Sequence, residues 1–292
     1  MTSVPLLSVG LLRTARDMRE ASEAIRRKGL RLGFVPTMGA LHEGHLALVA
    51  QARADCDVVV ASVYVNPLQF GPREDFAAYP RDLERDARLL AGAGTALLFA
   101  PAEGEVHLPG HRTSIEVTGM QDVLCGRSRP GHFRGVCTVV LKLFQIVAPH
   151  AAYFGEKDAQ QLRILRKMTR DLHLEVAIVG CATVRAEDGL ALSSRNAYLS
   201  PEERRAAPVL SRALRAAAEQ ARAGERDVPR LVEQAKSMIA AEPLARIDYV
   251  EAVDDESLGP VEVLDRPVLL AVAVFFGRAR LIDNIVIRPD ST

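Results

Sequence analysis

Two histidines three residues apart, His42 and His45, provide the clearest chemical signal in the sequence. They lie in residues 36–45, which follow a short apolar run and open a stretch with helical spacing. A helix start offers unpaired backbone N–H groups and the positive end of the helix dipole to a phosphate. The spacing predicts both imidazoles on one helical face, and Gly44 lets a phosphate approach the backbone. Taken alone, the pattern fits surface histidines on an ordinary helix equally well.

A second phosphate-binding pattern lies far downstream, at residues 192–196, Leu-Ser-Ser-Arg-Asn. Two hydroxyls beside the permanently charged guanidinium of Arg195 suit phosphate oxygens. On its own, this pattern is better explained as a helix cap or a turn. An H-x-G-H motif followed by a Ser-Ser-Arg loop is more specific, and the pair resembles the signature of the nucleotidyltransferase superfamily. Members of that superfamily, which include the class I aminoacyl-tRNA synthetases, bind ATP and transfer its adenylyl group with release of pyrophosphate.

Five further motifs narrow this resemblance. They are Val-Asn-Pro-Leu-Gln-Phe at 65–70, Tyr-Pro-Arg at 79–81, Arg-Pro-Gly-His-Phe-Arg-Gly-Val at 129–136, Phe-Gly-Glu-Lys-Asp-Ala-Gln-Gln at 154–161 and Leu-Ile-Asp-Asn at 281–284. In type and order they are similar to the motifs of the pantothenate synthetase family, from about residue 33 to residue 287. Leu192 is a mild departure, since the family often has Met there.

The resemblance implies an ATP-dependent ligase that joins (R)-pantoate to β-alanine through a C–N bond. The products would be pantothenate, a coenzyme A precursor, with AMP and pyrophosphate, and the intermediate would be a pantoyl-adenylate. The resemblance also implies Mg²⁺ with the ATP phosphates and a homodimer. The sequence does not identify Mg²⁺ ligands, because this ion keeps many waters and needs few protein groups.

The resemblance further implies a role for each matching residue. His45, His42, Lys157 and Arg195 would be catalytic. Gln69 and Gln161 would bind pantoate, and Gln69 with Asn66 would bind β-alanine. The residues expected to bind ATP are Met38, Gly39, Ala40, Leu41, His42, Glu43, Gly44, His45, Gly155, Glu156, Lys157, Asp158, Val184, Leu192, Ser193, Ser194 and Arg195.

These residue types suit the expected chemistry. Attack of a carboxylate on the α-phosphorus builds negative charge on the non-bridging and leaving oxygens, and fixed positive donors lower that barrier. Neutral glutamine amides can hold a carboxylate without a full ion pair, which leaves it a better nucleophile. Taken alone, however, Gln69 and Gln161 would be interpreted as solvent-facing amides.

Two other functions fit part of this pattern. Another H-x-G-H adenylyltransferase would share the histidine motif, but is not expected to share the motifs at 65–70 and 154–161. A non-catalytic ATP-binding module is expected to lose at least one of His45, Lys157 and Arg195, and all three are present. A tRNA synthetase would need an RNA-binding domain, and the formal net charge of +0 gives no indication of nucleic-acid binding.

Alternating strand and helix patterns surround these motifs. Strands are expected at 32–36, 57–65, 95–100, 151–154 and 174–179, with helices at 45–54, 81–91, 135–147 and 158–172. This alternation predicts a Rossmann-like, doubly wound parallel sheet, in which ligands bind at the carboxyl ends of strands. Two helices at 201–223 and 228–241 and three strands at 246–253, 268–276 and 279–287 predict a smaller α+β unit. We expect a nucleotide- and pantoate-binding domain at 1–186 and a C-terminal lid domain at 187–292.

Composition is consistent with a globular cytoplasmic enzyme. The 292 residues are 48% hydrophobic and 25% charged. No apolar run approaches the roughly 18 residues of a membrane helix, and the first residues lack the pattern of a signal peptide. The four cysteines occur singly, which favours free thiols over a zinc site or disulfides.

Overall fold

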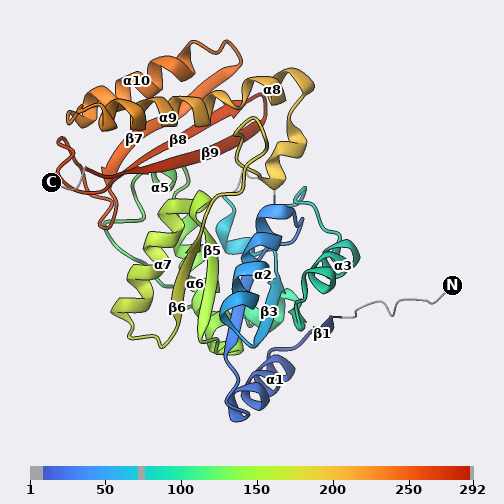
Figure 1. Ribbon diagram of the computed structural model, residues 1–292. Helices are drawn as coiled ribbons and strands as arrows, with labels where there is room; N and C mark the ends of the chain where they lie inside the picture. Colours follow the sequence, from blue (N-terminus) through green and yellow to red (C-terminus); the bar gives the residue numbers. More distant parts are fainter. Residues whose placement is uncertain (1–8, 72–75, 290–292) are drawn as a thin grey trace. The chain divides into compact units, whose positions relative to one another are not determined.

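The computed structural model describes residues 9–71 and 76–289, which form two compact units (Figure 1). The first unit comprises the described residues up to Val117, together with Gly131–Glu156 and Ile164–Ala182. The second comprises Thr118–Pro130, Lys157–Arg163 and the described residues from Thr183 onward. Two short segments before residue 187 therefore pack with the C-terminal part of the chain.

A six-stranded parallel sheet forms the centre of the first unit, in the order β1-β4-β3-β2-β5-β6. Its inner strands are rich in Val, Ala and Phe and are almost wholly buried, as expected for a parallel sheet covered on both faces. The strands are β1 (Gly10–Leu12), β2 (Leu32–Thr37), β3 (Val58–Val63), β4 (Leu97–Phe99), β5 (Ala151–Gly155) and β6 (Ala177–Cys181).

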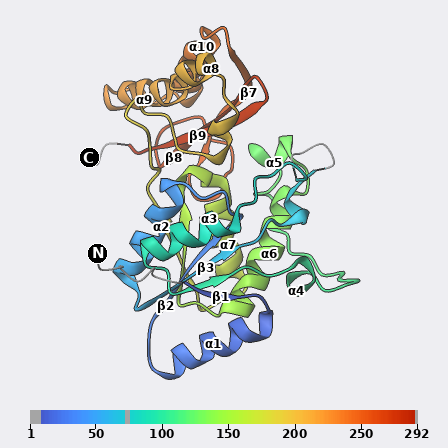
Figure 2. The same cartoon turned by 90° about the vertical axis from the view of Figure 1, so that its right-hand side faces the viewer.

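Helices cover the two faces of this sheet (Figure 2). Val35 packs with Leu48 and Leu90 in the core beneath α2 and α3. The residue before it, Phe34, contacts Phe144 of α6 instead. This alternation of side chains along β2 follows from the two-residue period of a strand. The helices that lie wholly in this unit are α1 (Ala15–Arg27), α2 (Glu43–Asp55), α3 (Leu83–Ala93), α4 (Glu103–Val106) and α6 (His132–Val147), with the 3₁₀ turn η1 (Pro67–Gln69).

An antiparallel sheet in the order β7-β8-β9 forms the second unit, with α9 and α10 packed on it. The central strand β8 is buried along almost its whole length, with Val272, Val274 and Phe276 in the core shared with the helices. The elements are β7 (Ala245–Asp254), β8 (Val268–Phe276), β9 (Ala279–Ile287), α5 (Cys125–Ser128), η3 (Ser194–Tyr198), α8 (Pro201–Ala206), α9 (Val209–Arg222) and α10 (Val228–Ala240).

The predicted fold class is confirmed: a doubly wound parallel sheet is followed by a smaller α+β unit. One predicted helix, 201–223, is wrong, because the chain breaks into α8 and α9 at Pro208. Proline has no N–H to donate to the preceding turn, which interrupts the helix. The strand β1 and the helix α1 were not predicted. The division into domains 1–186 and 187–292 stays a prediction, as do the roles given to them.

Two elements, η2 (Glu156–Asp158) and α7 (Ala159–Asp171), cross the division between the units. The break after Glu156 falls inside the predicted ATP-binding run 155–158. Gly155 and Glu156 therefore belong to the first unit, and Lys157 and Asp158 to the second.

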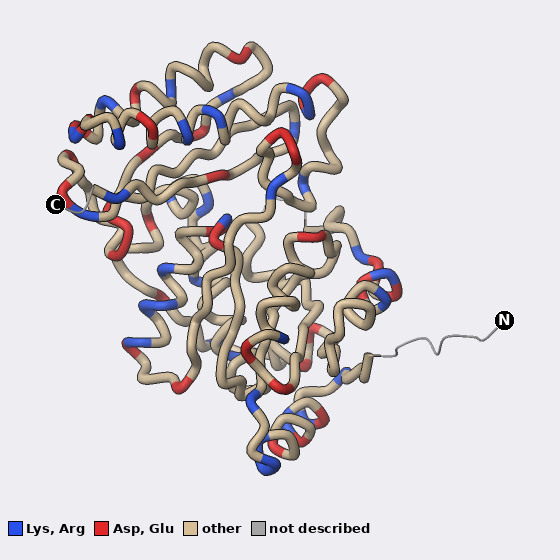
Figure 3. The backbone as a smooth tube through the Cα atoms, in the orientation of Figure 1, with Lys and Arg blue, Asp and Glu red and all other residues tan. Residues whose placement is uncertain are grey.

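Basic and acidic residues are both distributed over each unit, as Figure 3 shows. This mixture agrees with equal totals of 37 basic and 37 acidic residues. Within the described ranges, no helix combines the length and the hydrophobicity needed to cross a bilayer.

Gly135 of α6 packs directly against the backbone of η1, beside the predicted site residue Gln69. A methyl group there would overlap the Leu68 carbonyl and lie 2.9 Å from the backbone nitrogen of Gln69. We expect Gly135→Ala to lower the free energy of unfolding by about 1–3 kcal/mol, measured in urea, because backbone cannot move aside cheaply. Gly92→Ala in α3 is the matched control: nothing lies within 4 Å, so it should be neutral or stabilising. Equal stability of the Gly135→Ala and parent proteins would contradict this packing.

Candidate active site

The His42–His45 segment begins where β2 ends. The loop from Met38 to Leu41 turns sharply, with positive φ at Gly39 (82°) and Ala40 (52°), a conformation that is uncommon for a non-glycine residue. His42 is the N-cap of α2 in extended conformation, so it lies just outside the helix, and His45 lies in the first turn. A capping side chain must stand outside the helix to reach its first N–H groups.

The two imidazoles nevertheless lie side by side, with ring centroids 4.2 Å apart. The Nδ1 atom of His42 accepts from the Gly44 N–H at 3.1 Å, and Nδ1 of His45 accepts from the His42 N–H at 3.3 Å. An Nδ1 that accepts carries no proton, so each neutral ring carries its proton on Nε2. A methyl group on Gly44 would lie 2.8 Å from the His42 ring, so the glycine is needed for this capping box.

Asp86, which the sequence analysis missed, holds the loop in place. Its carboxylate, 1% exposed, accepts from the backbone N–H groups of Ala40 (3.0 Å) and Leu41 (2.9 Å). A side chain at Gly39 would lie 2.8 Å from the same carboxylate. The sequence signal that could have identified Asp86 was an acidic residue on the face of α3 that is otherwise apolar and buried. Such a residue needs buried donors, and here a strained loop supplies them.

The turn η1 places Asn66 and Gln69 just beyond the end of β3. The Asn66 amide nitrogen donates to Gln69 Oε1 (2.9 Å) and to the Gly135 carbonyl (3.1 Å). Its oxygen accepts from the Leu68 N–H (3.4 Å) and contacts His107 Nε2 (2.9 Å). All four hydrogen-bonding positions of the Asn66 amide are therefore filled by the protein. This arrangement favours a role in holding Gln69 over direct contact with β-alanine.

Gln69 is only 9% exposed, so the alternative of a solvent-facing amide does not describe it. Its backbone carbonyl contacts His132 Nδ1 at 2.8 Å, and its side-chain oxygen is engaged by Asn66. Burial of this kind restricts the side chain to one orientation, which suits a residue that must position a ligand.

The sheet order brings these groups to one edge of the first unit. From β2 the chain adds β3 and β4 on one side and then returns to add β5 and β6 on the other. The crevice at such a reversal, at the carboxyl ends of the strands, is where open α/β sheets bind ligands. Adjacent strands β3, β2 and β5 end at this edge. Residues that follow them there include Asn66 and Gln69, Met38–His45, and Gly155 with Glu156.

The other predicted site residues belong to the second unit. They are Lys157, Asp158, Gln161, Val184, Leu192, Ser193, Ser194 and Arg195. Lys157 is half-buried, and its carbonyl accepts from the Asn284 side chain at 2.9 Å. Gln161 is half-buried, whereas its neighbour Gln160 is buried and bonds to the backbone of Met120, Val123 and Cys125.

The Ser-Ser-Arg loop begins with a cap, as its plainer interpretation anticipated. Ser193 is the N-cap of η3, and its hydroxyl accepts from the Arg195 N–H at 3.3 Å. The segment before this loop is held by Arg185, whose guanidinium donates to the Gly189 carbonyl at 3.0 Å and makes a two-pronged contact with Asp283 at 2.6 and 2.8 Å. Hydrogen bonds from the guanidinium to the nearly buried Asp283 carboxylate raise the pKa of Arg185. Asp283 was noted only as a motif residue, and this contact is its structural role.

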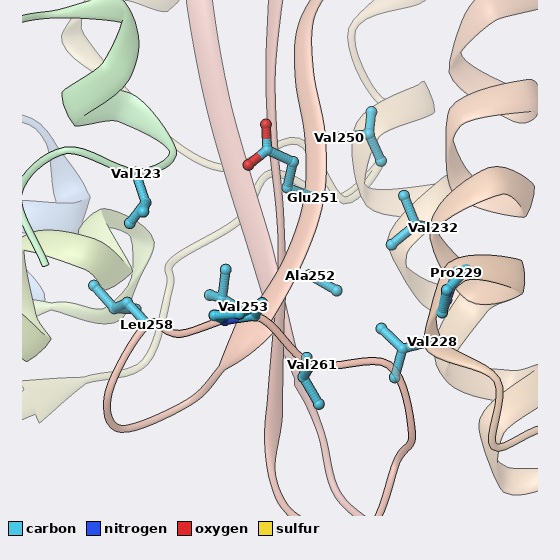
Figure 4. Close-up of a pocket in the computed structure, with 11 residues that line it drawn as sticks. Val123, Val228, Pro229, Val232, Val250, Glu251, Ala252, Val253, Leu258 and Val261 are labelled. Atoms are coloured by element: carbon cyan, nitrogen blue, oxygen red, sulfur yellow. The ribbon is translucent and has the colours of Figure 1, made fainter. Parts of the chain in front are cut away.

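A cavity of about 330 Å³ also lies in the second unit (Figure 4). Valines of β7 and α10 line it, and its one charged residue, Glu251, pairs with Arg127 at 2.5 Å. None of the predicted site residues lines this cavity. Across the ranges that the structure describes, no group of three or more His, Cys, Asp or Glu is arranged to hold a metal ion.

The lowered pKa of His107, beside Asn66, makes the stability of the folded protein depend on pH. Burial, and then the charges of Lys142 and His111, lower its pKa to about 4, and the Tyr64 ring faces it at 6.0 Å. An unfolded chain titrates at this residue near pH ~6.5. Between these values the unfolded state binds a proton that the folded state excludes, so stability falls as pH falls from about 6.5 to about 4. Urea unfolding of His107→Gln should show a shallower loss over this range. An unchanged pH dependence would contradict the shift.

Comparisons with known proteins agree with one another. The family model described as "Pantoate-beta-alanine ligase" matches residues 10–286. Pantothenate synthetase from Heliobacterium modesticaldum is 57% identical over 277 residues, 95% of this chain and 99% of that protein. The one from Thermotoga neapolitana is 53% identical, with the same coverage.

Solved structures lead to the same family. Pantothenate synthetase from Thermus thermophilus is 50% identical with a TM-score of 0.90, covering 96% of this chain and 100% of that one. Pantoate-beta-alanine ligase from Francisella tularensis, complexed with "Beta-gamma ATP and Beta-alanine", is 32% identical with a TM-score of 0.78, covering 96% and 98%. The chain belongs to the pantoate–β-alanine ligase family.

Proposed function

We propose that this chain joins (R)-pantoate to β-alanine through a pantoyl-adenylate, with His45 and His42 assisting attack on ATP. The ATP-dependent ligase activity follows from the family to which the chain belongs. The observation that carries the catalytic proposal is the histidine pair at the end of β2. Both Nδ1 atoms accept backbone N–H groups there, so the neutral rings carry donors on Nε2.

In the first step, a carboxylate oxygen of pantoate attacks the α-phosphorus of ATP. The bond from that phosphorus to the bridging oxygen of the β-phosphate breaks, and pyrophosphate leaves. Negative charge grows on the non-bridging and leaving oxygens, where a preorganised donor stabilises the transition state most. We assign this stabilisation to His45 and His42 in the first unit and to Lys157 and Arg195 in the second. The remaining predicted ATP residues in 38–45, 155–158, 184 and 192–195 would hold the nucleotide.

In the second step, the amine of β-alanine attacks the activated carbonyl carbon. AMP leaves, a proton is lost from the nitrogen, and the amide of pantothenate forms. An acyl phosphate anhydride is already reactive, so positioning can supply most of this catalysis. We assign Gln69 and Gln161 to pantoate, and Gln69 also to the β-alanine site.

Mg²⁺ would enter with ATP rather than in a protein cage. Because Mg²⁺ is commonly held by substrate phosphates, waters and one or two carboxylates, it needs no larger cluster. One carboxylate near the carboxyl edge of the parallel sheet, that of Asp86, already accepts two backbone N–H groups.

Substitution of His45 tests the catalytic assignment. We expect His45→Ala to reduce pantoate-dependent pyrophosphate release by roughly 100- to 1000-fold, as for loss of one preorganised donor. The matched control is His173→Asn: His173 is exposed and has φ of 50°, a conformation that asparagine tolerates. AMP release should depend on β-alanine in the parent enzyme. Pyrophosphate release by His45→Ala at the parent rate would overturn the assignment.

We also propose that the C-terminal unit acts as a lid that orders around ATP. Arg195 and the serines of the loop would then gain phosphate partners, and excluding water would protect the hydrolysable adenylate. Hydrogen exchange across residues 186–200 should slow when ATP and pantoate bind together, while α10 stays unchanged as an internal control. Exchange that is equally slow with and without substrates would make this segment a fixed wall of the site.

The remaining proposals are a homodimer, which rests on the family resemblance, and a cytoplasmic location. Sedimentation velocity at micromolar concentration addresses the first: a single species of monomer mass would refute it.

A further inference from the structure

A chain of side-chain hydrogen bonds runs through the first unit behind Gln69. Lys142 of α6 contacts His107 Nδ1 at 3.2 Å, and His107 Nε2 contacts Asn66 Oδ1 at 2.9 Å. The Asn66 amide nitrogen then donates to Gln69 Oε1 at 2.9 Å. His107, Asn66 and Gln69 are each at most 9% exposed, so water competes little for these bonds.

We propose that Lys142 and His107 are positioning residues that set the direction of this chain, so that Gln69 offers its amide N–H groups to an oxygen of the substrate. The proposal rests on the assignment of Gln69 to pantoate. Neither Lys142 nor His107 needs to touch the substrate, because each acts through the next residue in the chain.

Two backbone groups fix the orientation of Asn66. The Gly135 carbonyl can only accept, so the atom of Asn66 that faces it at 3.1 Å is the amide nitrogen. The Leu68 N–H can only donate, so the atom that it meets at 3.4 Å is the oxygen. The contact between His107 Nε2 and that oxygen therefore requires a proton on Nε2.

Lys142 determines the protonation of the other ring nitrogen of His107, Nδ1. An ammonium group donates and cannot accept, so His107 Nδ1 must carry a lone pair. The same ammonium donates to the Val106 carbonyl at 3.1 Å, which holds it beside the ring. His107 is neutral because burial lowers its pKa to about 4. The contact with Asn66 and the contact with Lys142 both place its single proton on Nε2.

The orientation of Asn66 in turn determines the orientation of the Gln69 amide. Because Asn66 presents an N–H, the Gln69 atom that meets it must be the carbonyl oxygen, and the amide nitrogen points to the other side of the side chain. A carboxylate or hydroxyl oxygen is the chemical partner of such a donor. Without Lys142, the His107 proton can move to Nδ1 and the Nε2 lone pair would then face the Asn66 oxygen, which loosens Asn66 and Gln69.

The test compares substitutions that preserve the direction of the chain with ones that remove it. His107→Gln keeps one acceptor and one donor, whereas His107→Leu keeps neither, and Lys142→Met removes the ammonium. We expect a roughly tenfold rise in the KM for pantoate in the Leu and Met variants, little change in the KM for ATP, and recovery in His107→Gln. Lys167→Met is the matched control, because Lys167 is exposed and pairs with Asp171 one turn further along α7.

A spectroscopic readout does not depend on activity. Nitrogen-15 NMR of histidine-labelled protein should show His107 protonated at Nε2 at pH 7, with this form lost or mixed in Lys142→Met. A His107 proton on Nδ1 in the parent protein would overturn the proposed direction. This measurement remains decisive if His107→Leu does not fold.

Two variants of Gln69 separate failure of this proposal from failure of the proposed function. Gln69→Ala should raise the KM for pantoate, and Gln69→Glu should raise it further, because a carboxylate would face the substrate oxygen. An unchanged KM in Gln69→Ala refutes the assignment of Gln69 to pantoate. A raised KM in Gln69→Ala with parent behaviour in both His107→Leu and Lys142→Met refutes the positioning chain alone.

Discussion

Parallel pairing of β2 with β3 on one side and with β5 on the other is the constraint on which the rest of the first unit depends. Parallel strands end at the same edge, so this pairing brings segments more than 100 residues apart in sequence to one edge of the sheet. A slip by one residue would move Val35 to the face that Phe34 now occupies and Phe34 to the face of Val35, so the two side chains would exchange their helical partners. The histidine segment and η1 are therefore placed by backbone pairing in the sheet before any of their own side chains contribute.

Buried polar groups then convert this coarse placement into defined geometry. Asp86 holds a loop with two positive φ angles, and Asn66 holds Gln69 with every hydrogen-bonding position of its amide filled. A buried polar group that lacks its partner costs about 1–3 kcal/mol, so these networks strongly favour one arrangement. Gly135 contributes to this geometry through its small size, because only a residue without a side chain lets α6 approach η1 closely enough.

The second unit uses charged pairs to hold its irregular segments. Arg185, which precedes the Ser-Ser-Arg loop, pairs with Asp283 of β9, and Arg163 pairs with Asp255 beyond the end of β7. Arginine suits both places because its planar fork meets a carboxylate with two donors. Segments 118–130 and 157–163 join the three-stranded sheet through such contacts, although the sequence pattern assigned them to the preceding domain.

The sequence by itself determined the fold class, the family and the motifs. Hydrophobic periodicity and strongly patterned short segments such as 36–45 and 154–161 are local signals, and local signals can be interpreted without coordinates. Only the tertiary structure decided that the His42 side chain caps α2, that Pro208 divides a predicted helix, and which long-range partners Gln69 acquires. Lys142 and His107 belong to no motif. Their relation to Gln69 arises where α6 and the segment after α4 meet η1, and such contacts between distant segments are set by packing rather than by spacing along the chain.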